Sequence, residues 1–226
     1  MEKISTGAVF LDKLLEGGYE KGIVTTLYGP SGTGKTNFCL LAASKIAASG
    51  KKVLFVDTEG GIAVERIKQL NGINSNYLAL LDQILFFNPV NFAEQIEAFG
   101  QLKALVNGQA GLIVIDSISM LYRLELGKNE EVYEVNSALG QQIGGLVEIA
   151  RRHNLPVLIT NQVYTDFDNR NKVKMVGGDL LKYGSKCILE LQKTDLQRIL
   201  LLRKHRFLPE SKEIIFKIVE QGIEEA

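Results

Sequence analysis

The segment from Gly29 to Thr36 has the composition of a loop that binds a polyphosphate. Its sequence, GPSGTGKT, matches the pattern G-x-x-x-x-G-K-[ST] at every fixed position. Glycines let backbone N–H groups approach an anion closely, and a following helix adds its free N–H groups and positive dipole end. We expect Lys35 to contact the phosphates and the Thr36 hydroxyl to bind Mg²⁺. The expected nucleotide-binding loop comprises Gly29, Pro30, Ser31, Gly32, Thr33, Gly34, Lys35 and Thr36.

The sequence around this loop favours nucleotide binding over an ordinary glycine-rich turn. Residues 23–28 are typical of a buried strand, and residues 35–49 are typical of a helix. Strand, loop and helix in this order form the context that a phosphate loop requires. An N-K-x-D segment that would select guanine follows none of the predicted strands, so ATP is favoured over GTP.

Polar side chains follow other apolar strands. Asp116 ends the run LIVID, and we expect it to complete a Mg²⁺ site, although an isolated strand-ending aspartate is common. Asp57 and Glu59 follow the run VLFV, and either is suited to activating a water molecule or to being solvated. Asn161 and Gln162 end the run LIT, where their amides are suited to contacting a γ-phosphate or to capping the strand. The pattern alone leaves these alternatives open.

These groups must be positioned by the elements around them. Apolar strands that alternate with helices predict an α/β fold with a mainly parallel central sheet covered on both faces. From Ser185 onward, strands with short polar connections predict a C-terminal antiparallel extension, with a hairpin turn at 193–196. Residues 163–178 predict a long polar loop. The predicted strands are 23–28, 52–58, 84–89, 111–117 and 156–162, and the predicted helices are 35–49, 62–70, 92–106 and 131–153.

Composition narrows the class of protein. The chain has 226 residues, 46% of them hydrophobic, and a formal net charge of zero, so it has enough residues for one sizeable α/β domain and is not a polyanion binder over its whole surface. Apolar runs are too short for a membrane span, and the first residues lack the apolar core of a secretory signal. Cys39 and Cys187 lie in apolar elements and are predicted to be buried free thiols. We expect a cytoplasmic protein.

Charge is nevertheless unevenly distributed. The segment from Arg170 to Arg206 contains ten Lys or Arg residues and three acidic residues, so it carries a formal charge of +7 (10 − 3 = 7). Such clustering is what an anion-binding surface needs, although a solvated basic face has the same composition.

Taken together, the motifs resemble the RecA-type recombinase core, in particular its archaeal and eukaryotic branch. The resemblance rests on TGAVFLDKLLEGG, GPSGTGKT, VDTEGG, LIVIDS, TNQV, GGD and LPE in this order, and it covers nearly the entire chain. DTEG and TNQV are more specific to that branch than the P-loop is. The resemblance implies a RecA-like P-loop ATPase core that uses ATP and Mg²⁺.

The resemblance also implies roles for individual residues. Glu59 corresponds to the glutamate that activates water, and Gln162 to the glutamine that senses the γ-phosphate and couples it to a DNA-binding loop. Arg66 falls at the position that packs over the adenine. The segment after Gln162 falls where the family places that DNA loop, and its cations are Arg170, Lys172 and Lys174.

Two departures from full recombinases affect the expected function. The core begins within a few residues of Met1, so we expect a single RecA-like ATPase domain over 1–226, without the N-terminal helical DNA-binding domain or the Phe-x-x-Ala tether. The other family DNA loop, at 127–136, contains three acidic residues and one lysine. The expected function is an accessory that binds ATP and DNA, preferably single-stranded, hydrolyses ATP weakly and assists the main recombinase, RadA in archaea, or other repair proteins. A RecA-fold switch without a DNA role and a ring-helicase motor remain alternatives.

A last pattern concerns Lys204 and Arg206. One residue separates them, so in an extended strand both point to the same face. This Lys-x-Arg pattern resembles the pair that some RecA-fold ATPases insert into the ATP site of a neighbouring subunit. A solvated strand end is the alternative. Self-association of the chain would be needed for such a trans-acting finger.

Overall fold

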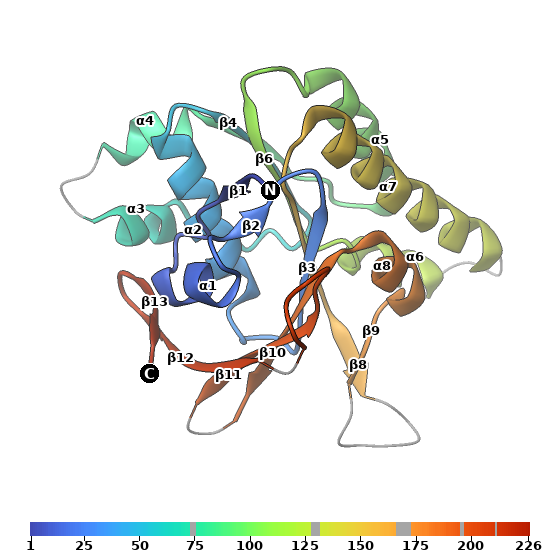
Figure 1. Cartoon of the computed structure of the whole chain (residues 1–226). Coiled ribbons are helices and arrows are strands. Elements are labelled where there is room, and N and C mark those ends of the chain that lie inside the picture. The colour runs from blue at the N-terminus through green and yellow to red at the C-terminus, as the bar shows by residue number, and fades with distance from the viewer. Residues whose placement is uncertain (73–75, 128–131, 166–172, 195–196, 211) are drawn as a thin grey trace.

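A central sheet divides the molecule into two helical layers (Figure 1). The computed structural model describes residues 1–72, 76–127, 132–165, 173–194, 197–210 and 212–226, and in these residues the sheet has nine strands in the order β13-β12-β11-β10-β3-β7-β6-β4-β5. The strands from β10 to β5 are parallel, and β11, β12 and β13 continue the sheet in antiparallel pairs. Their bounds are β3 Val24–Tyr28, β4 Lys52–Asp57, β5 Ile84–Phe87, β6 Ala110–Asp116, β7 Val157–Asn161, β10 Cys187–Lys193, β11 Arg198–Lys204, β12 Glu213–Val219 and β13 Gly222–Glu225.

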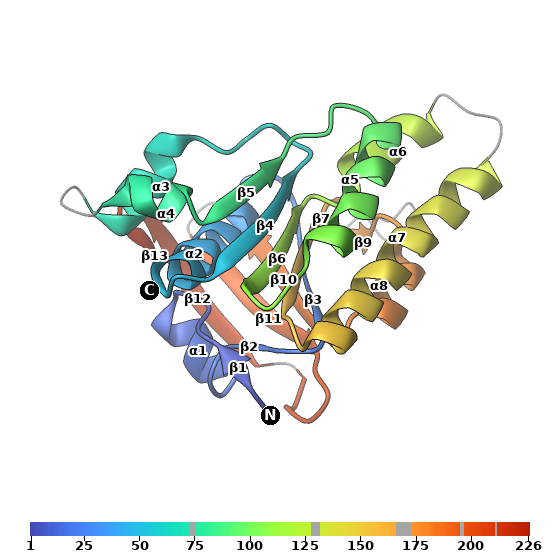
Figure 2. The same ribbon diagram turned by 90° about the horizontal axis from the view of Figure 1, so that it is seen from above.

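The helices separate according to the sheet face that they cover (Figure 2). One face packs on α1 to α4 and the other on α5 to α8. Along β4, Val53 and Phe55 belong to the first core, whereas Leu54 and Val56 belong to the second. Because successive strand residues point to opposite faces, an unbroken apolar run buries both faces. The helices are α1 Val9–Leu14, α2 Lys35–Ala48, α3 Val64–Asn71, α4 Tyr77–Leu81, α5 Phe92–Leu105, α6 Met120–Leu126, α7 Val132–His153 and α8 Gly178–Gly184.

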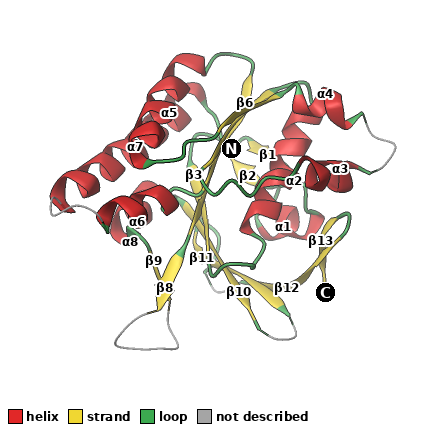
Figure 3. Cartoon of the chain, turned by 180° about the vertical axis from the view of Figure 1, so that it is seen from behind, coloured by secondary structure: helices red, strands yellow, loops and turns green. Residues whose placement is uncertain are grey.

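The predicted fold class is confirmed, with one refinement at the C-terminal part. The prediction assigned the strand after Ser185 to the antiparallel extension. In the structure β10 pairs in parallel with β3, from Cys187 opposite Thr25 to Glu190 opposite Tyr28, and antiparallel with β11. Strand β10 is therefore the junction between the two parts of the sheet. Helix α8 precedes it and returns the chain to the amino ends of the parallel strands, where β10 begins beside β3 (Figure 3).

The prediction of a loop over the whole of 163–178 was wrong at its two ends. Val163–Thr165 forms β8 and pairs antiparallel with β9, Val173–Met175, while α8 begins at Gly178. The reason is local: Met175 and Val176 carry apolar side chains that are buried on the protein, which holds this end of the segment in place. Residues 166–172 between the two strands lie outside the described residues.

A cluster of three aromatic rings ties the C-terminal strands to the P-loop helix. Phe216 of β12 lies edge-on to Phe38 of α2, with 5.4 Å between ring centroids, and it stacks on Phe10 of α1 at 6.2 Å. All three side chains are buried. Edge-to-face and stacked pairs at such distances are favourable beyond the area that they bury. The cluster therefore positions β12 over the start of α2.

Two smaller predictions concern the thiols and the absence of a membrane span. Cys39 and Cys187 are buried and free, as predicted, and burial raises the pKa of the Cys187 thiol to about 12. In the described part of the chain, no helix combines the length and hydrophobicity that crossing a membrane requires.

Replacing Phe216 should strongly destabilise the fold. Phe216→Ala removes a fully buried ring and leaves a cavity between α1, α2 and β12, which should lower the free energy of unfolding by about 3–5 kcal/mol. Urea denaturation measures this change. Ile215→Ala is the matched control, because the neighbouring side chain is 40% exposed, and it should cost less than about 1 kcal/mol. Equal losses for the two variants would contradict the role assigned to the cluster.

Candidate functional site

A cavity of about 440 Å³ lies at the carboxyl edge of the parallel strands. Its walls come from the P-loop and the start of α2, from the ends of β4 and β7, from α6 and from β12. In open parallel sheets this edge is where ligands bind. The residues that line the cavity are Gly29, Ser31, Gly32, Gly34, Lys35, Thr36, Asn37, Glu59, Arg123, Gln162, Val163 and Ile218.

A second cavity of similar size, about 470 Å³, lies between α5 and α7. Its lining is mostly apolar, with the Lys103–Glu148 ion pair at its side. It contains none of the residues expected to bind phosphate, whereas the cavity at the sheet edge contains most of them. The cavity at the sheet edge is therefore the candidate site.

Two glycines of the P-loop are required by neighbouring segments. A Cβ atom on Gly29 would lie 2.1 Å from the backbone oxygen of Leu191 in β10, so only glycine fits at this close approach. Gly34 has a left-handed backbone with φ of 104° at the N-terminus of α2, and a Cβ atom there would lie 2.9 Å from Ile218. Glycine at these two positions lets the P-loop pack between β10 and β12, while both residues line the cavity.

The Lys35 side chain is held at the P-loop. Its Nζ atom donates to the carbonyl oxygens of Gly29 at 2.8 Å and Pro30 at 2.9 Å, and Lys35 is buried. Burial lowers the pKa of Lys35, and the nearby charges of Glu59 and Asp116 oppose that effect. An ammonium group in this position is available to the phosphates of a nucleotide in the cavity.

Asp116 lies beside Thr36 at the end of β6. Its side chain is buried and accepts a hydrogen bond from the Thr160 hydroxyl. Burial raises the pKa of Asp116, while the hydrogen bonds from Thr160 and Thr36 lower it. A carboxylate and a hydroxyl in contact offer the hard oxygen ligands that Mg²⁺ prefers. The donor set of the described residues therefore fits a magnesium ion next to the P-loop.

The structure gives different surroundings to the two acids that follow β4. Asp57 is buried, and its Oδ1 accepts the backbone N–H groups of Glu59 at 3.0 Å and Gly60 at 2.9 Å, while Oδ2 accepts that of Ile62 at 3.3 Å. These bonds shape the turn. Glu59 instead lines the cavity. Asp57 thus directs the chain so that Glu59 faces the site.

The two amide side chains at the end of β7 differ in the same way. Asn161 is fully buried, and its Nδ2 donates to the carbonyl of Val176 at 2.9 Å. Gln162 lines the cavity, and its Nε2 donates to Oε1 of Glu59 at 2.8 Å. The structure therefore brings together the two residues to which the resemblance assigns catalytic and sensing roles, from strands that are not neighbours in the sheet.

Arg66 joins three segments next to the P-loop. Its Nε donates to Oδ1 of Asn37 at 2.7 Å, and its guanidinium donates to the carbonyls of Glu220 at 2.8 Å and Val219 at 3.1 Å. Arg66 is thus fixed between the start of α2 and the turn from β12 to β13. This position borders the candidate site, while contact with adenine stays a prediction.

The predicted DNA-binding cations are only partly described. Arg170 and Lys172 lie outside the described residues, and Lys174 is exposed on β9. Elsewhere in the basic segment, three of the described cations form ion pairs within the chain, two of them with acids that the formal charge of +7 already includes. These pairs are Arg203–Glu190 at 2.5 Å, Arg206–Glu20 at 3.2 Å and Lys182–Asp179 at 3.7 Å.

Lys204 and Arg206 lie at the opposite edge of the sheet from the P-loop. Since β11 is antiparallel to β10, its first residue Arg198 donates to Gly32 of the P-loop, whereas Lys204 pairs with Ile188 at the other end. Lys204 donates to the carbonyls of Lys182 and Ser185. The pair is therefore remote from the ATP site of its own chain, so an ATP-site role would have to be in a neighbour.

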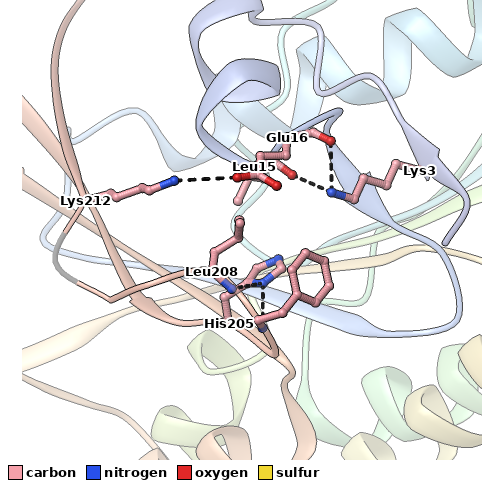
Figure 4. A network of polar contacts seen from close by, with 7 residues as sticks. Lys3, Leu15, Glu16, His205, Leu208 and Lys212 are labelled. Atoms are coloured by element: carbon pink, nitrogen blue, oxygen red, sulfur yellow. Dashed lines mark hydrogen bonds and ion pairs between the residues drawn. The ribbon is translucent and has the colours of Figure 1, made fainter.

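His205, between these two cations, has a local structural role (Figure 4). Its Nδ1 accepts the backbone N–H groups of Phe207 at 3.5 Å and Leu208 at 3.3 Å. The same view shows Lys3 donating to the carbonyls of Leu15 and Glu16. Burial lowers the pKa of His205, which favours the neutral ring that can accept these bonds.

Sequence reasoning did not single out Asn37, Arg123 or Ile218 as site residues. Asn37 directly follows the P-loop motif but falls outside its fixed positions. Arg123 is a single cation on the helix after β6, and no spacing rule marks it. Ile218 comes from the far end of the chain and reaches the cavity because β12 packs over α2.

Comparison with known proteins assigns a family to this site. The family model described as Rad51 matches residues 1–226. The chain belongs to the Rad51 family.

Among curated relatives, proteins described as "DNA repair and recombination protein RadB" are similar over nearly their whole length. The protein from Methanococcus maripaludis strain C5 is 46% identical, covering 95% of this chain and 96% of the relative. The protein from Thermococcus gammatolerans is 42% identical, covering 98% of each. A solved structure, "Crystal structure of the RadB recombinase", is 38% identical with a TM-score of 0.83, covering 98% of this chain and 99% of that one. The resemblance to the archaeal and eukaryotic branch of the RecA-type recombinases is thus confirmed, and the similar proteins named here are RadB proteins.

Removing the P-loop lysine should abolish tight nucleotide binding without unfolding the protein. Lys35→Ala deletes a charged donor at the phosphates, which should weaken binding of a non-hydrolysable ATP analogue by about 10- to 100-fold. Isothermal titration calorimetry measures the affinity, and circular dichroism checks folding. Lys45→Ala, at an exposed position of the same helix, should leave the affinity unchanged. A folded Lys35→Ala variant with parental affinity would refute the phosphate assignment.

Proposed function

We propose that this chain binds ATP with Mg²⁺ in the cavity at the sheet edge, hydrolyses it slowly, and acts in DNA recombination and repair as an accessory of the main recombinase. The observation that carries the proposal is the convergence of Lys35, Thr36, Asp116, Glu59 and Gln162 on one edge of the sheet. The names of the relatives, which describe DNA repair and recombination proteins, support the biological role.

The residues of the site have distinct tasks in this proposal. Lys35 and the P-loop backbone hold the phosphates, and Thr36 and Asp116 hold the metal. The bound Mg²⁺ neutralises charge on the phosphate oxygens. Glu59 accepts a proton from the attacking water as general base, and Gln162 contacts the γ-phosphate end of the cavity. Because β8 begins directly after Gln162, a movement of this side chain on nucleotide binding would act on the strand that leads to the proposed DNA-binding cations.

Slow hydrolysis by a single subunit follows from the position of the expected finger. Lys204 and Arg206 lie at the far edge of the sheet from the P-loop. A cation that stabilises charge on the transferred phosphoryl group has a large effect on such reactions. An isolated subunit without that cation would therefore be a weak ATPase, and association of subunits would stimulate it.

One observation favours a second candidate, an ATPase switch without a DNA role. Three described cations of the basic segment form ion pairs within the chain, and one of the paired acids, Glu20, lies outside the segment, so that this pair lowers the charge available to DNA from +7 to +6 (7 − 1 = 6). The two candidates are distinguished by measuring the affinity for labelled single-stranded DNA with and without a non-hydrolysable ATP analogue. DNA binding that tightens with the analogue supports the proposed function, and no DNA binding in either state supports the switch.

The DNA contact should be electrostatic and directed at the backbone. Replacing Arg170, Lys172 and Lys174 together by alanine should weaken single-stranded DNA binding similarly for different sequences. The slope of log K against log salt should fall by up to about one unit for each lost phosphate contact. Fluorescence anisotropy titrations at several salt concentrations measure the slope. A control with alanine at Lys13, Lys45 and Lys51, which are exposed, changes the net charge equally. An unchanged slope in the first triple variant would contradict the contact.

The finger prediction is tested by complementation between subunits. ATP turnover per subunit should rise with protein concentration, and Lys204→Ala/Arg206→Ala should bind ATP but lose this rise. Adding Lys35→Ala subunits, which retain the finger but lack the phosphate lysine, should restore turnover to the double variant. Because Arg206 pairs with buried Glu20, the single variant Lys204→Ala repeats the test with this ion pair intact, and it should also lose most of the rise. If the double variant hydrolyses ATP at the rate of the parent at every protein concentration, Lys204 and Arg206 have no finger role.

A further inference from the structure

Arg123 lies at the mouth of the candidate site in contact with a residue of the proposed chemistry. Its Nη1 donates to Oε1 of Gln162 at 3.0 Å, and Nε2 of Gln162 donates to Oε1 of Glu59 at 2.8 Å. The three side chains therefore form a chain of hydrogen bonds from α6 through the end of β7 to the turn after β4. All three line the same cavity as Lys35 and Thr36.

The chemistry of these groups allows one orientation of the Gln162 amide. A guanidinium group only donates hydrogen bonds, and a carboxylate only accepts them. The amide must therefore turn its oxygen to Arg123 and its NH₂ group to Glu59. Reversing it would place NH₂ against the guanidinium and the oxygen against the carboxylate, which loses both bonds. Arg123 is thus the group that decides which end of the amide meets Glu59.

The position of Arg123 follows from how α6 is anchored. Leu121 and Tyr122 are buried on the α5–α7 side of the sheet, and the Tyr122 hydroxyl donates to Asn136 of α7 at 2.5 Å. The next side chain, Arg123, is exposed and reaches the cavity. In addition, the Gln162 backbone N–H donates to the Ser119 hydroxyl at 3.1 Å. The helix would therefore stay in place without the Arg123 side chain.

We propose that Arg123 is a positioning residue of the ATP site, which orients Gln162 toward Glu59 and links helix α6 to the γ-phosphate end of the cavity. This inference rests on the proposed function for its role in hydrolysis. Its geometric part stands independently of nucleotide. In the site, an oriented Gln162 holds the Glu59 carboxylate, so that the other carboxylate oxygen is available to take the proton of the attacking water.

The orientation is tested first without nucleotide, by NMR of the Gln162 side-chain amide. Its resonances are assigned by their loss in Gln162→Ala. In Arg123→Ala they should move to the positions of a solvated glutamine, whereas in Arg123→Lys, which keeps a charged donor, they should stay near those of the parent. Arg152→Ala removes an exposed arginine of α7 that pairs with Glu148 and serves as the control, with no change expected.

The effect on chemistry is tested by single-turnover hydrolysis of labelled ATP, which measures slow rates. Arg123→Ala should lower the rate about tenfold while the affinity for a non-hydrolysable analogue changes less than about twofold. Because Arg123 acts through Gln162, the double variant Arg123→Ala/Gln162→Ala should be no slower than Gln162→Ala alone. Unchanged amide resonances in Arg123→Ala overturn the proposal. So does a double variant whose loss in hydrolysis rate is the product of the losses in the two single variants. A parent protein that binds no ATP analogue overturns the proposed function instead, and the amide measurement still decides the orientation.

Discussion

The burial of two opposite charges, Lys35 and Asp116, at one edge of the sheet is the constraint on which the rest of the structure depends. Removing an isolated charge from water is costly unless hydrogen bonds and opposite charges compensate. Lys35 meets this requirement with the carbonyls of Gly29 and Pro30, and Asp116 with the hydroxyls of Thr160 and Thr36. The P-loop and the ends of β6 and β7 must therefore keep these positions for the charges to be tolerated.

This requirement reaches both cores of the molecule. On one side, Gly29 packs on the backbone of β10, and the ring cluster of Phe10, Phe38 and Phe216 fixes β12 over the first turn of α2. On the other side, α6 is anchored on its buried residues and reaches back to the site with Arg123. The cavity thus receives groups from segments that are far apart in the chain, and it lies where the two helical layers meet the edge of the sheet.

The family membership and the site geometry are separate observations, and both support the proposed binding and hydrolysis of ATP. The relatives are similar over nearly their whole length, while the contacts of Glu59 with Gln162 and of Arg66 with Asn37 come from the structure alone. The alternatives that the sequence left open are separated by hydrogen bonding. The Asp57 carboxylate accepts backbone N–H groups and the Asn161 Nδ2 donates to a backbone carbonyl, whereas the side chains of Glu59 and Gln162 line the cavity.

The sequence by itself determined the alternating α/β fold, the P-loop and the strand-ending polar residues, because each depends on local patterns. Unbroken apolar runs bury both faces of a strand, and glycine spacing selects the loop backbone. Only the tertiary structure decided that β10 joins β3 in parallel, that β8 and β9 pair within the expected loop, and that Arg123 and Ile218 line the cavity. These features depend on contacts between residues distant in sequence. Residue type and spacing within one segment do not show such contacts. They are set when the sheet and its two helical layers pack together.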